Sequence, residues 1–151
     1  MRKISIALTL GFLLTGVAIA SESTDVMAAV HQFVDGFNKG DAASALAACA
    51  AQTSILDEFP PHEWHGDGAC AAWAKDYEAD ARKNGITDGA VTLGNPRHVD
   101  ITGDSAYVVV PVSYSYKRNG KPEKETSSTF VVTLHTRDSG WRITGWAWAK
   151  Q

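Results

Sequence analysis

The sequence predicts an α+β domain in which three helices near the N-terminus pack against an antiparallel sheet. Two observations lead to this prediction. Apolar residues recur at the spacing of a helix face up to about residue 85, and the spacing then changes to two, which is typical of strands. A run of helices followed by a run of strands is the pattern of an α+β fold, in which the helices cover one face of the sheet.

The length and the composition fit one globular domain. The chain has 151 residues, of which 44% are hydrophobic and 21% charged, and its formal net charge is -3. These values exclude a disordered tail and a collagen-like protein. A net-negative chain without a run of Lys or Arg also gives little reason to expect nucleic acid or an anionic membrane as a partner.

The first twenty residues have the pattern of an export signal. Two basic residues precede an apolar run over 4–17, and a small-x-small cleavage pattern ends at Ala20. The apolar run would span about 21 Å as a helix, which is too short for the ~30 Å hydrocarbon core of a membrane. We therefore expect a signal peptide over residues 1–20. The mature domain would be residues 21–151, periplasmic or secreted and free of the membrane.

The first predicted helix begins near Ser23 or Thr24 and stops at Gly40. Its apolar residues recur at intervals of three and four, which places them on one face of the helix. These residues are Val26, Val30, Phe33 and Phe37.

Two further helices are predicted before the sheet. Asp41 is well placed to cap a short second helix, which runs to about Ala50. The third helix covers residues 69–84, where Trp73 and Tyr77 lie four residues apart and hence on the same face.

A short strand is predicted over residues 53–59, ended by Pro60 and Pro61. Turn sequences then divide the second half into longer strands, and Asn119-Gly120 is the strongest of these turns because both residues tolerate positive φ. Strands joined by short turns form an antiparallel meander. The expected strands lie near 89–101, 105–117, 124–136 and 141–149.

Apolar side chains are expected on both faces of the sheet. Strict alternation in the last strand places Trp141 and Ile143 on one face and Trp146 and Trp148 on the other. A sheet with one face in water would alternate more cleanly. We therefore expect a homodimer that forms through the sheet. The alternative is that these aromatic side chains lie singly on a solvated face.

Cys49 and Cys70 are the two cysteines of the chain, and two alternatives remain open for them. In an oxidising compartment they can form a disulfide that closes a loop of about twenty residues. They can equally be separate buried thiols in Ala-rich helices. Two cysteines without a matching Cys/His quartet give no reason to expect a metal site. The chain also lacks a Gly-rich phosphate loop, so no cofactor is expected.

Three segments of the chain resemble the nuclear transport factor 2-like superfamily, and within it the SnoaL-like and ketosteroid-isomerase-like proteins. These segments are Phe37-Asn38-Lys39-Gly40-Asp41, Ser54-Ile55-Leu56-Asp57 running to Gly66, and Gly140-Trp141-Arg142-Ile143-Thr144-Gly145-Trp146. The resemblance covers roughly residues 24–150 and implies that the sheet is strongly curved and forms a cone with a pocket at its wide end. The same shell serves isomerases, dehydratases, hydrolases and non-catalytic binders. It therefore implies a pocket for a small molecule, and no particular reaction.

Asp57 is the first candidate for chemistry. The resemblance places it where the ketosteroid isomerases have the carboxylate that shuttles a proton. Its neighbours Leu56 and Phe59 are apolar, and an apolar wall would raise the pKa of the carboxyl toward neutral pH. The alternative is that Asp57 caps the turn before Pro60.

The tyrosine that those isomerases pair with the base has no counterpart at the matching position, which is Phe33. Phenylalanine cannot donate a hydrogen bond to a developing oxyanion. Steroid isomerisation by the known arrangement is therefore not expected, unless Tyr77, Tyr107 or Tyr114 reaches the same place from elsewhere.

Residues 60–66 form the most unusual segment, with His62, Trp64 and His65 beside two prolines. His62 is a candidate for proton transfer because an imidazole titrates near neutral pH. The alternatives are a solvated loop and a weak metal site that would use His62, His65 and Asp57. The aromatic residues of the chain are expected either in the core or on the walls of the pocket. The candidates for ligand contact are Trp64, Trp73, Tyr77, Tyr114 and Trp146.

Two functions follow from these residues. The first is a non-catalytic protein that binds a small apolar or aromatic molecule in the pocket. The second is a proton-transfer enzyme, an isomerase, dehydratase or hydrolase, with Asp57 as general base. The missing tyrosine at position 33 favours the first.

Overall fold

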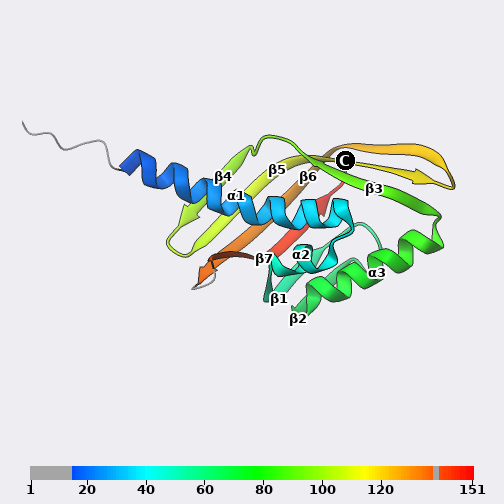
Figure 1. Cartoon of the computed structure of the whole chain (residues 1–151), viewed down its shortest axis with the longest axis horizontal. Coiled ribbons are helices and arrows are strands. Elements are labelled where there is room, and N and C mark those ends of the chain that lie inside the picture. The colour runs from blue at the N-terminus through cyan, green and yellow to red at the C-terminus, as the bar shows by residue number, and fades with distance from the viewer. Residues whose placement is uncertain (1–14, 138–139) are drawn as a thin grey trace, which may run out of the picture.

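The computed structural model describes residues 15–137 and 140–151, which form three helices and a seven-stranded sheet (Figure 1). The predicted export signal covers residues 1–20. Residues 1–14 lie outside the described residues, and for residues 15–20 only the backbone is described, so the export signal stays a prediction. Within the described residues, no helix is both long and apolar enough to cross a membrane. The elements are α1 (Thr15–Lys39), α2 (Ala42–Ala47), β1 (Cys49–Leu56), β2 (Glu63–Asp67), α3 (Ala69–Lys83), β3 (Ile86–Leu93), β4 (His98–Thr102), β5 (Ser105–Arg118), β6 (Lys121–Arg137) and β7 (Gly140–Ala149).

The predicted apolar face of α1 packs into the core. Val26, Val30 and Phe33 are buried, as their spacing indicates. The helix begins at Thr15, earlier than the expected start near residue 23. Most residues between these two positions are small or good helix formers, and none of them is proline. The helix can therefore begin before residue 23.

Helix α2 is shorter than predicted. Its cap is confirmed, because the Asp41 Oδ1 atom accepts a hydrogen bond of 3.0 Å from the backbone N–H of Ser44. The helix ends at Ala47, three residues before the expected end at Ala50. The reason is that the chain already bonds to the sheet at Ala48, whose carbonyl accepts a hydrogen bond of 2.9 Å from the Ile143 N–H of β7.

The sheet is mixed, curled and unclosed, and its strand order is β2-β1-β7-β6-β5-β3, with β4 also paired to β5. The predicted antiparallel meander is confirmed for β5, β6 and β7, whereas β1 joins β7 in parallel. The segment over residues 60–66 was expected to be a loop, and its second half instead forms β2, an antiparallel partner of β1. Trp64 lies in this hairpin and is buried.

The single strand expected near residues 89–101 is two strands, β3 and β4. The break falls between them because Pro96 has no N–H for the ladder. Both strands still follow the same edge of β5, since the N–H of Gly94 donates to the Pro111 carbonyl and that of Arg97 to the Val109 carbonyl.

A bulge in β7 changes which face its aromatic residues occupy. Leu134 pairs with Ile143 and Thr133 pairs with Gly145, which leaves Thr144 without a partner. One extra residue reverses the alternation, so the residues after the bulge share a face with those before it. The prediction of two apolar faces in this strand is therefore wrong: Trp146 lies on the inner face with Ile143.

The bulge also removes one argument for a homodimer. The outer face keeps fewer apolar side chains than strict alternation predicts, and the large ones that are well exposed are Leu56, at 56%, and Tyr107, at 43%. The homodimer stays a prediction.

Helix α3 contacts β1 and β2 at one end of the sheet and β3 at the other. It therefore spans the opening that the curled strands leave (Figure 1). Between the helices and the inner face lies one apolar core, to which α1 contributes Phe33 and α3 contributes Trp73.

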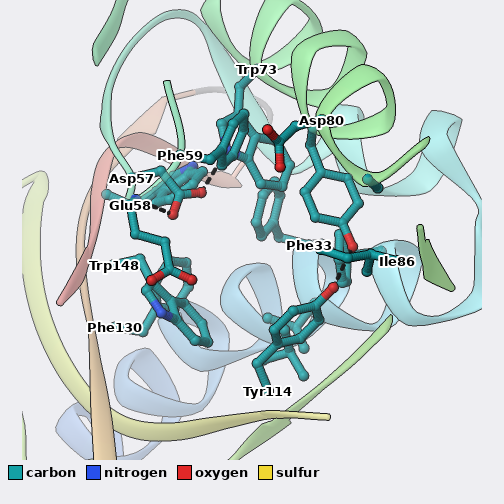
Figure 2. A pocket seen from close by; sticks show the side chains of 16 residues that line it. Phe33, Asp57, Glu58, Phe59, Trp73, Asp80, Ile86, Tyr114, Phe130 and Trp148 are labelled. Atoms are coloured by element: carbon teal, nitrogen blue, oxygen red, sulfur yellow. Dashed lines mark hydrogen bonds between the residues drawn. The ribbon is translucent and has the colours of Figure 1, made fainter. Parts of the chain in front are cut away.

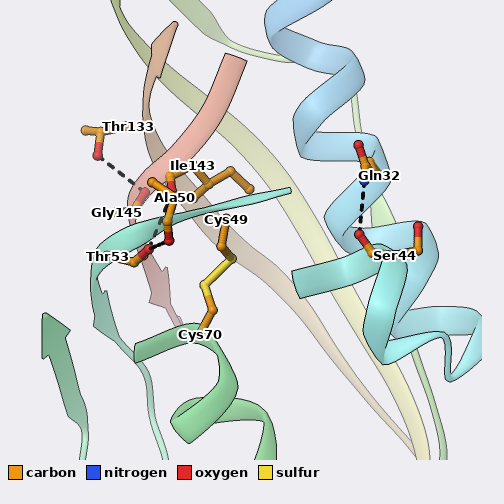
Figure 3. Close-up of a disulfide and its surroundings, with 9 residues drawn as sticks. All are labelled: Gln32, Ser44, Cys49, Ala50, Thr53, Cys70, Thr133, Ile143 and Gly145. Carbon is orange, nitrogen blue, oxygen red and sulfur yellow. Dashed lines mark hydrogen bonds between the residues drawn. A yellow bond between two sulfur atoms is a disulfide. The ribbon is translucent and has the colours of Figure 1, made fainter. Parts of the chain in front are cut away.

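Cys49 and Cys70 form a disulfide, which is the first of the two alternatives that the sequence leaves open (Figure 3). It joins the first residue of β1 to the second residue of α3. The second alternative placed both cysteines in helices, and Cys49 is outside a helix because α2 ends early. The bond links the first turn of α3 to β1, near the edge of the sheet opposite to β3.

Candidate functional site

A cavity of about 110 Å³ lies between α1, α3 and the inner face of the sheet. Sixteen residues line it, and most of its wall is aromatic (Figure 2). The aromatic residues on the wall are Phe33, Phe37, Phe59, Trp73, Tyr77, Tyr114, Phe130, Trp146 and Trp148. The bulge at Thr144 matters here, because it brings Trp146 and Trp148 to this side of the sheet.

Asp57 follows the last residue of β1 and lies on the cavity wall. Its Oδ2 atom accepts a hydrogen bond of 2.8 Å from the Trp73 indole N–H, and its Oδ1 atom accepts one of 2.7 Å from the backbone N–H of Glu58. Burial raises the pKa of the Asp57 carboxyl from 3.8 to about 6, although these two hydrogen bonds oppose the shift. At neutral pH the group is an ionised base in an apolar setting.

A second acid beside Asp57 belongs to a charged cluster at the cavity rim. Glu58 Oε2 lies 2.8 Å from Lys150 Nζ, and the same nitrogen lies 3.0 Å from Glu125 Oε2. Burial raises the pKa of Glu58, and the nearby Glu125 charge adds to this effect. Lys150 is thus held between two carboxylates.

Glu125 is the buried member of that cluster. Burial favours its neutral form, but hydrogen bonds from Ser128, Trp148 and Lys150 outweigh this and lower its pKa. The Trp148 indole N–H donates to Glu125 Oε1 over 2.7 Å. This bond fixes the orientation of an aromatic ring on the cavity wall.

Two tyrosines line the cavity, and one of them, Tyr114, lies across it from Asp57 (Figure 2). The hydroxyl oxygens of Tyr77 and Tyr114 are 2.6 Å apart. Burial raises the pKa of both phenols, so both are neutral at physiological pH. One of the two protons is used within the pair, which leaves the other hydroxyl proton available to a ligand.

Phe33 lies on the same cavity wall. It stands where the family resemblance implies a tyrosine in the isomerases, and it offers no donor. Of the three tyrosines considered from the sequence, Tyr77 and Tyr114 reach the cavity from other elements, whereas Tyr107 is exposed on the outer face.

The charge on the cavity wall is of one sign. Asp57, Glu58 and Asp80 line it, and among the described residues no Lys, Arg or His does. The described residues also contain no group of three or more His, Cys, Asp or Glu side chains that could hold a metal ion.

The structure brings together four of the five residues proposed for ligand contact. Trp73, Tyr77, Tyr114 and Trp146 line the cavity. Trp64 does not: it is buried in β2, where its indole N–H donates to Asp76 Oδ2 over 2.9 Å.

His62 also lies outside the cavity wall. It is exposed in the turn between β1 and β2, and its Nδ1 atom lies 3.1 Å from the carbonyl oxygen of Asp57. The ring thus contacts the backbone of the candidate base and not its carboxyl group. The His65 Nδ1 atom lies 3.4 Å from Glu63 Oε1 on the exposed side of β2.

Sequence reasoning missed the cluster of Glu58, Glu125 and Lys150, and it missed Asp80. One sequence feature could have indicated Glu58 as a site residue, namely its position beside Asp57. No sequence feature indicates Glu125 or Lys150, because only the pairing of β6 with β5 and β7 brings them to the cavity rim.

Comparison with solved structures finds the same fold in other proteins. An NTF2-like superfamily protein from Salmonella enterica serovar Typhimurium aligns with a TM-score of 0.73 at 14% identity, over 87% of this chain and 92% of that one. An NTF2-like protein with a cystatin-like fold from Novosphingobium aromaticivorans aligns with a TM-score of 0.71 at 16% identity, over 89% and 85%. A ketosteroid isomerase-like protein from Erwinia carotovora atroseptica aligns with a TM-score of 0.66 at 16% identity, over 85% and 95%.

Comparison with protein-family models found no match, and comparison with curated proteins found none either. Identities this low show the fold and carry no activity to this chain.

Proposed function

We propose that this chain, which has the fold of the NTF2-like superfamily, binds a small and largely apolar molecule in the aromatic cavity. The observation that carries the proposal is the wall itself. Aromatic rings enclose the space from α1, α3, β5, β6 and β7, and a few polar groups on Asp57 and the tyrosine pair face it. Apolar walls with a small number of placed polar groups are typical of ligand sites.

The volume limits the part of the ligand that is enclosed. An apolar cavity of roughly 150 Å³ holds one benzene molecule. A cavity of about 110 Å³ therefore encloses a group the size of one ring or smaller, and any larger body would extend through the rim near Glu58. A whole steroid does not fit inside this volume.

A test of binding uses 4-methylphenol as a neutral probe and tryptophan fluorescence as the signal. Ile86 lines the cavity and is half-buried, so Ile86→Trp should fill the space. We expect this variant to weaken binding by at least about tenfold, or 1.4 kcal/mol.

The matched control is Ile101→Trp on β4, where the isoleucine is also half-buried but does not line the cavity. It should bind the probe as the wild type does. Equal affinity of all three proteins, or no binding by the wild type, would reject the cavity as the site.

A second candidate function is proton transfer with Asp57 as general base. The observation that favours it is the pairing of a carboxyl with a pKa of about 6 with a free tyrosine hydroxyl on the opposite wall. The carboxylate would take a proton from a carbon beside a carbonyl group. The hydroxyl would donate a hydrogen bond to the oxyanion that develops.

This candidate predicts catalysed hydrogen exchange in a small aryl ketone. With acetophenone in D₂O at pH 7.5, the wild type should accelerate deuteration of the methyl group, followed by proton NMR. Asp57→Asn should lose this acceleration, since a positioned general base contributes about 10²- to 10⁴-fold. If both proteins exchange the ketone at the buffer rate while 4-methylphenol still binds, the chain is a binder without this activity.

A further inference from the structure

We propose that the ligand of this cavity is a substituted ammonium ion, in which a positively charged nitrogen carries apolar groups. The inference rests on the proposed binding function and adds the charge of the ligand. The juxtaposition that carries it is an aromatic wall with carboxylates and, among the described residues that line it, no cationic side chain.

The aromatic part of the wall suits such a cation. Phe37, Trp73 and Tyr77 form one cluster with ring centroids 5.0 to 6.1 Å apart. Tyr114 and Trp148 meet edge to face on another side of the cavity, at 6.5 Å. Rings on several sides of one small space attract an alkylated ammonium ion through their π faces, and they also supply the apolar contact that its methyl or methylene groups need.

The carboxylates on the wall also favour a positively charged ligand. Asp57 and Asp80 reach the cavity from two different elements, the end of β1 and α3 (Figure 2). The Asp80 side chain has no ion-pair partner among the described residues. An anionic ligand would meet repulsion from both acids, whereas a cation would be attracted in a site of low polarity, where charge interactions are strong.

The chain already shows that this rim accepts an ammonium group. Lys150 Nζ lies within 3.0 Å of both Glu58 and Glu125. Because that contact uses Glu58 and Glu125, it leaves Asp57 and Asp80 on the inner wall for a ligand. Lys150 itself does not line the cavity.

The test compares two probes of the same shape on the full-length chain. Choline and 3,3-dimethylbutan-1-ol differ in one atom, a charged nitrogen in place of a neutral carbon. We expect choline to bind at least about tenfold more tightly at pH 7.5, a preference in the range of a desolvated cation–π contact. Asp80→Asn should reduce the preference by about threefold or more. Asp100→Asn, which makes the same charge change at an exposed position on β4, should leave it unchanged.

Equal or tighter binding of the neutral alcohol would overturn the inference and leave the proposed binding function intact. A choline preference that Asp80→Asn and Asp100→Asn alter equally would also overturn it, because the selection would then come from the overall charge of the protein. Failure of choline, the alcohol and 4-methylphenol alike to bind would instead reject the cavity as a binding site.

Discussion

The stability of Asp57→Asn relative to the wild type is expected to increase as the pH rises from 4 to 7.5. The pKa of this carboxyl is raised from 3.8 to about 6, chiefly by burial. A carboxyl whose pKa is higher in the folded state holds its proton more tightly there, so its contribution favours folding at low pH. That contribution is lost as the pH rises from about 4 to 6, and above pH 6 the folded state carries the cost of a buried charge.

The size of the effect follows from the shift. About two pKa units at 1.36 kcal/mol each give a change of about 3 kcal/mol in the stability difference between wild type and variant. Urea unfolding of both proteins at pH 4, 5, 6 and 7.5 would measure it. The expected result is a difference that grows with pH in favour of Asp57→Asn. Two stability curves that run parallel across this range would show that the carboxyl is not desolvated.

The same comparison distinguishes a site residue from a structural one. Asp100→Asn removes an exposed carboxylate and should leave the pH dependence as it is in the wild type. A group that lowers stability at the working pH of the protein is expected where function requires it. A turn cap, which was the alternative role for Asp57, would give a difference in stability between wild type and variant that does not grow with pH.

Removal of the disulfide is expected to lower the free energy of unfolding by about 3 kcal/mol, which is the loop-closure value for a separation of 21 residues between Cys49 and Cys70. The bond holds the start of α3 against β1, and α3 closes the side of the cavity that the sheet leaves open. We therefore expect the double variant Cys49→Ala/Cys70→Ala to unfold at lower urea and to bind 4-methylphenol less tightly.

Urea unfolding with and without a reducing agent checks this expectation. The reductant should destabilise the wild type to about the level of the double variant and should leave the double variant unchanged. A wild type that is equally stable in both conditions would contradict a structural role for the bond.

The sequence predicted the elements whose signals are local. The stripe of Val26, Val30 and Phe33 identified the buried face of α1, and Asp41 identified the start of α2. The meander of β5, β6 and β7 followed from the period of two and from the turn at Asn119-Gly120. These features depend on residues close to one another in the chain, where spacing alone carries the information.

The features that the sequence could not predict depend on pairing between distant strands. The bulge at Thr144 is a feature of the pairing between β6 and β7. Without it, Trp146 and Trp148 were expected on the face opposite to Ile143. Similarly, Trp64 in β2 is buried because its hairpin packs against α3, which no local pattern shows.

In the candidate site, too, the sequence indicated individual residues but not how they are arranged. A family resemblance pointed to Asp57, and the aromatic content of the chain pointed to Trp73, Tyr77 and Tyr114. Their arrangement came only from the fold: the Trp73 N–H bonds to the carboxyl of Asp57, and Tyr77 on α3 meets Tyr114 on β5. Two tyrosine hydroxyls thus reach the cavity from other elements, whereas Phe33 offers none.

The most direct test of this account is the titration of the Asp57 carboxyl carbon by ¹³C NMR in the full-length protein, with Asp57→Asn used to assign the signal. We expect a midpoint near pH 6, because the group lies on the wall of an apolar cavity. A midpoint near that of a free aspartate, about 3.9, would place the carboxyl in open solvent and would contradict the site described above.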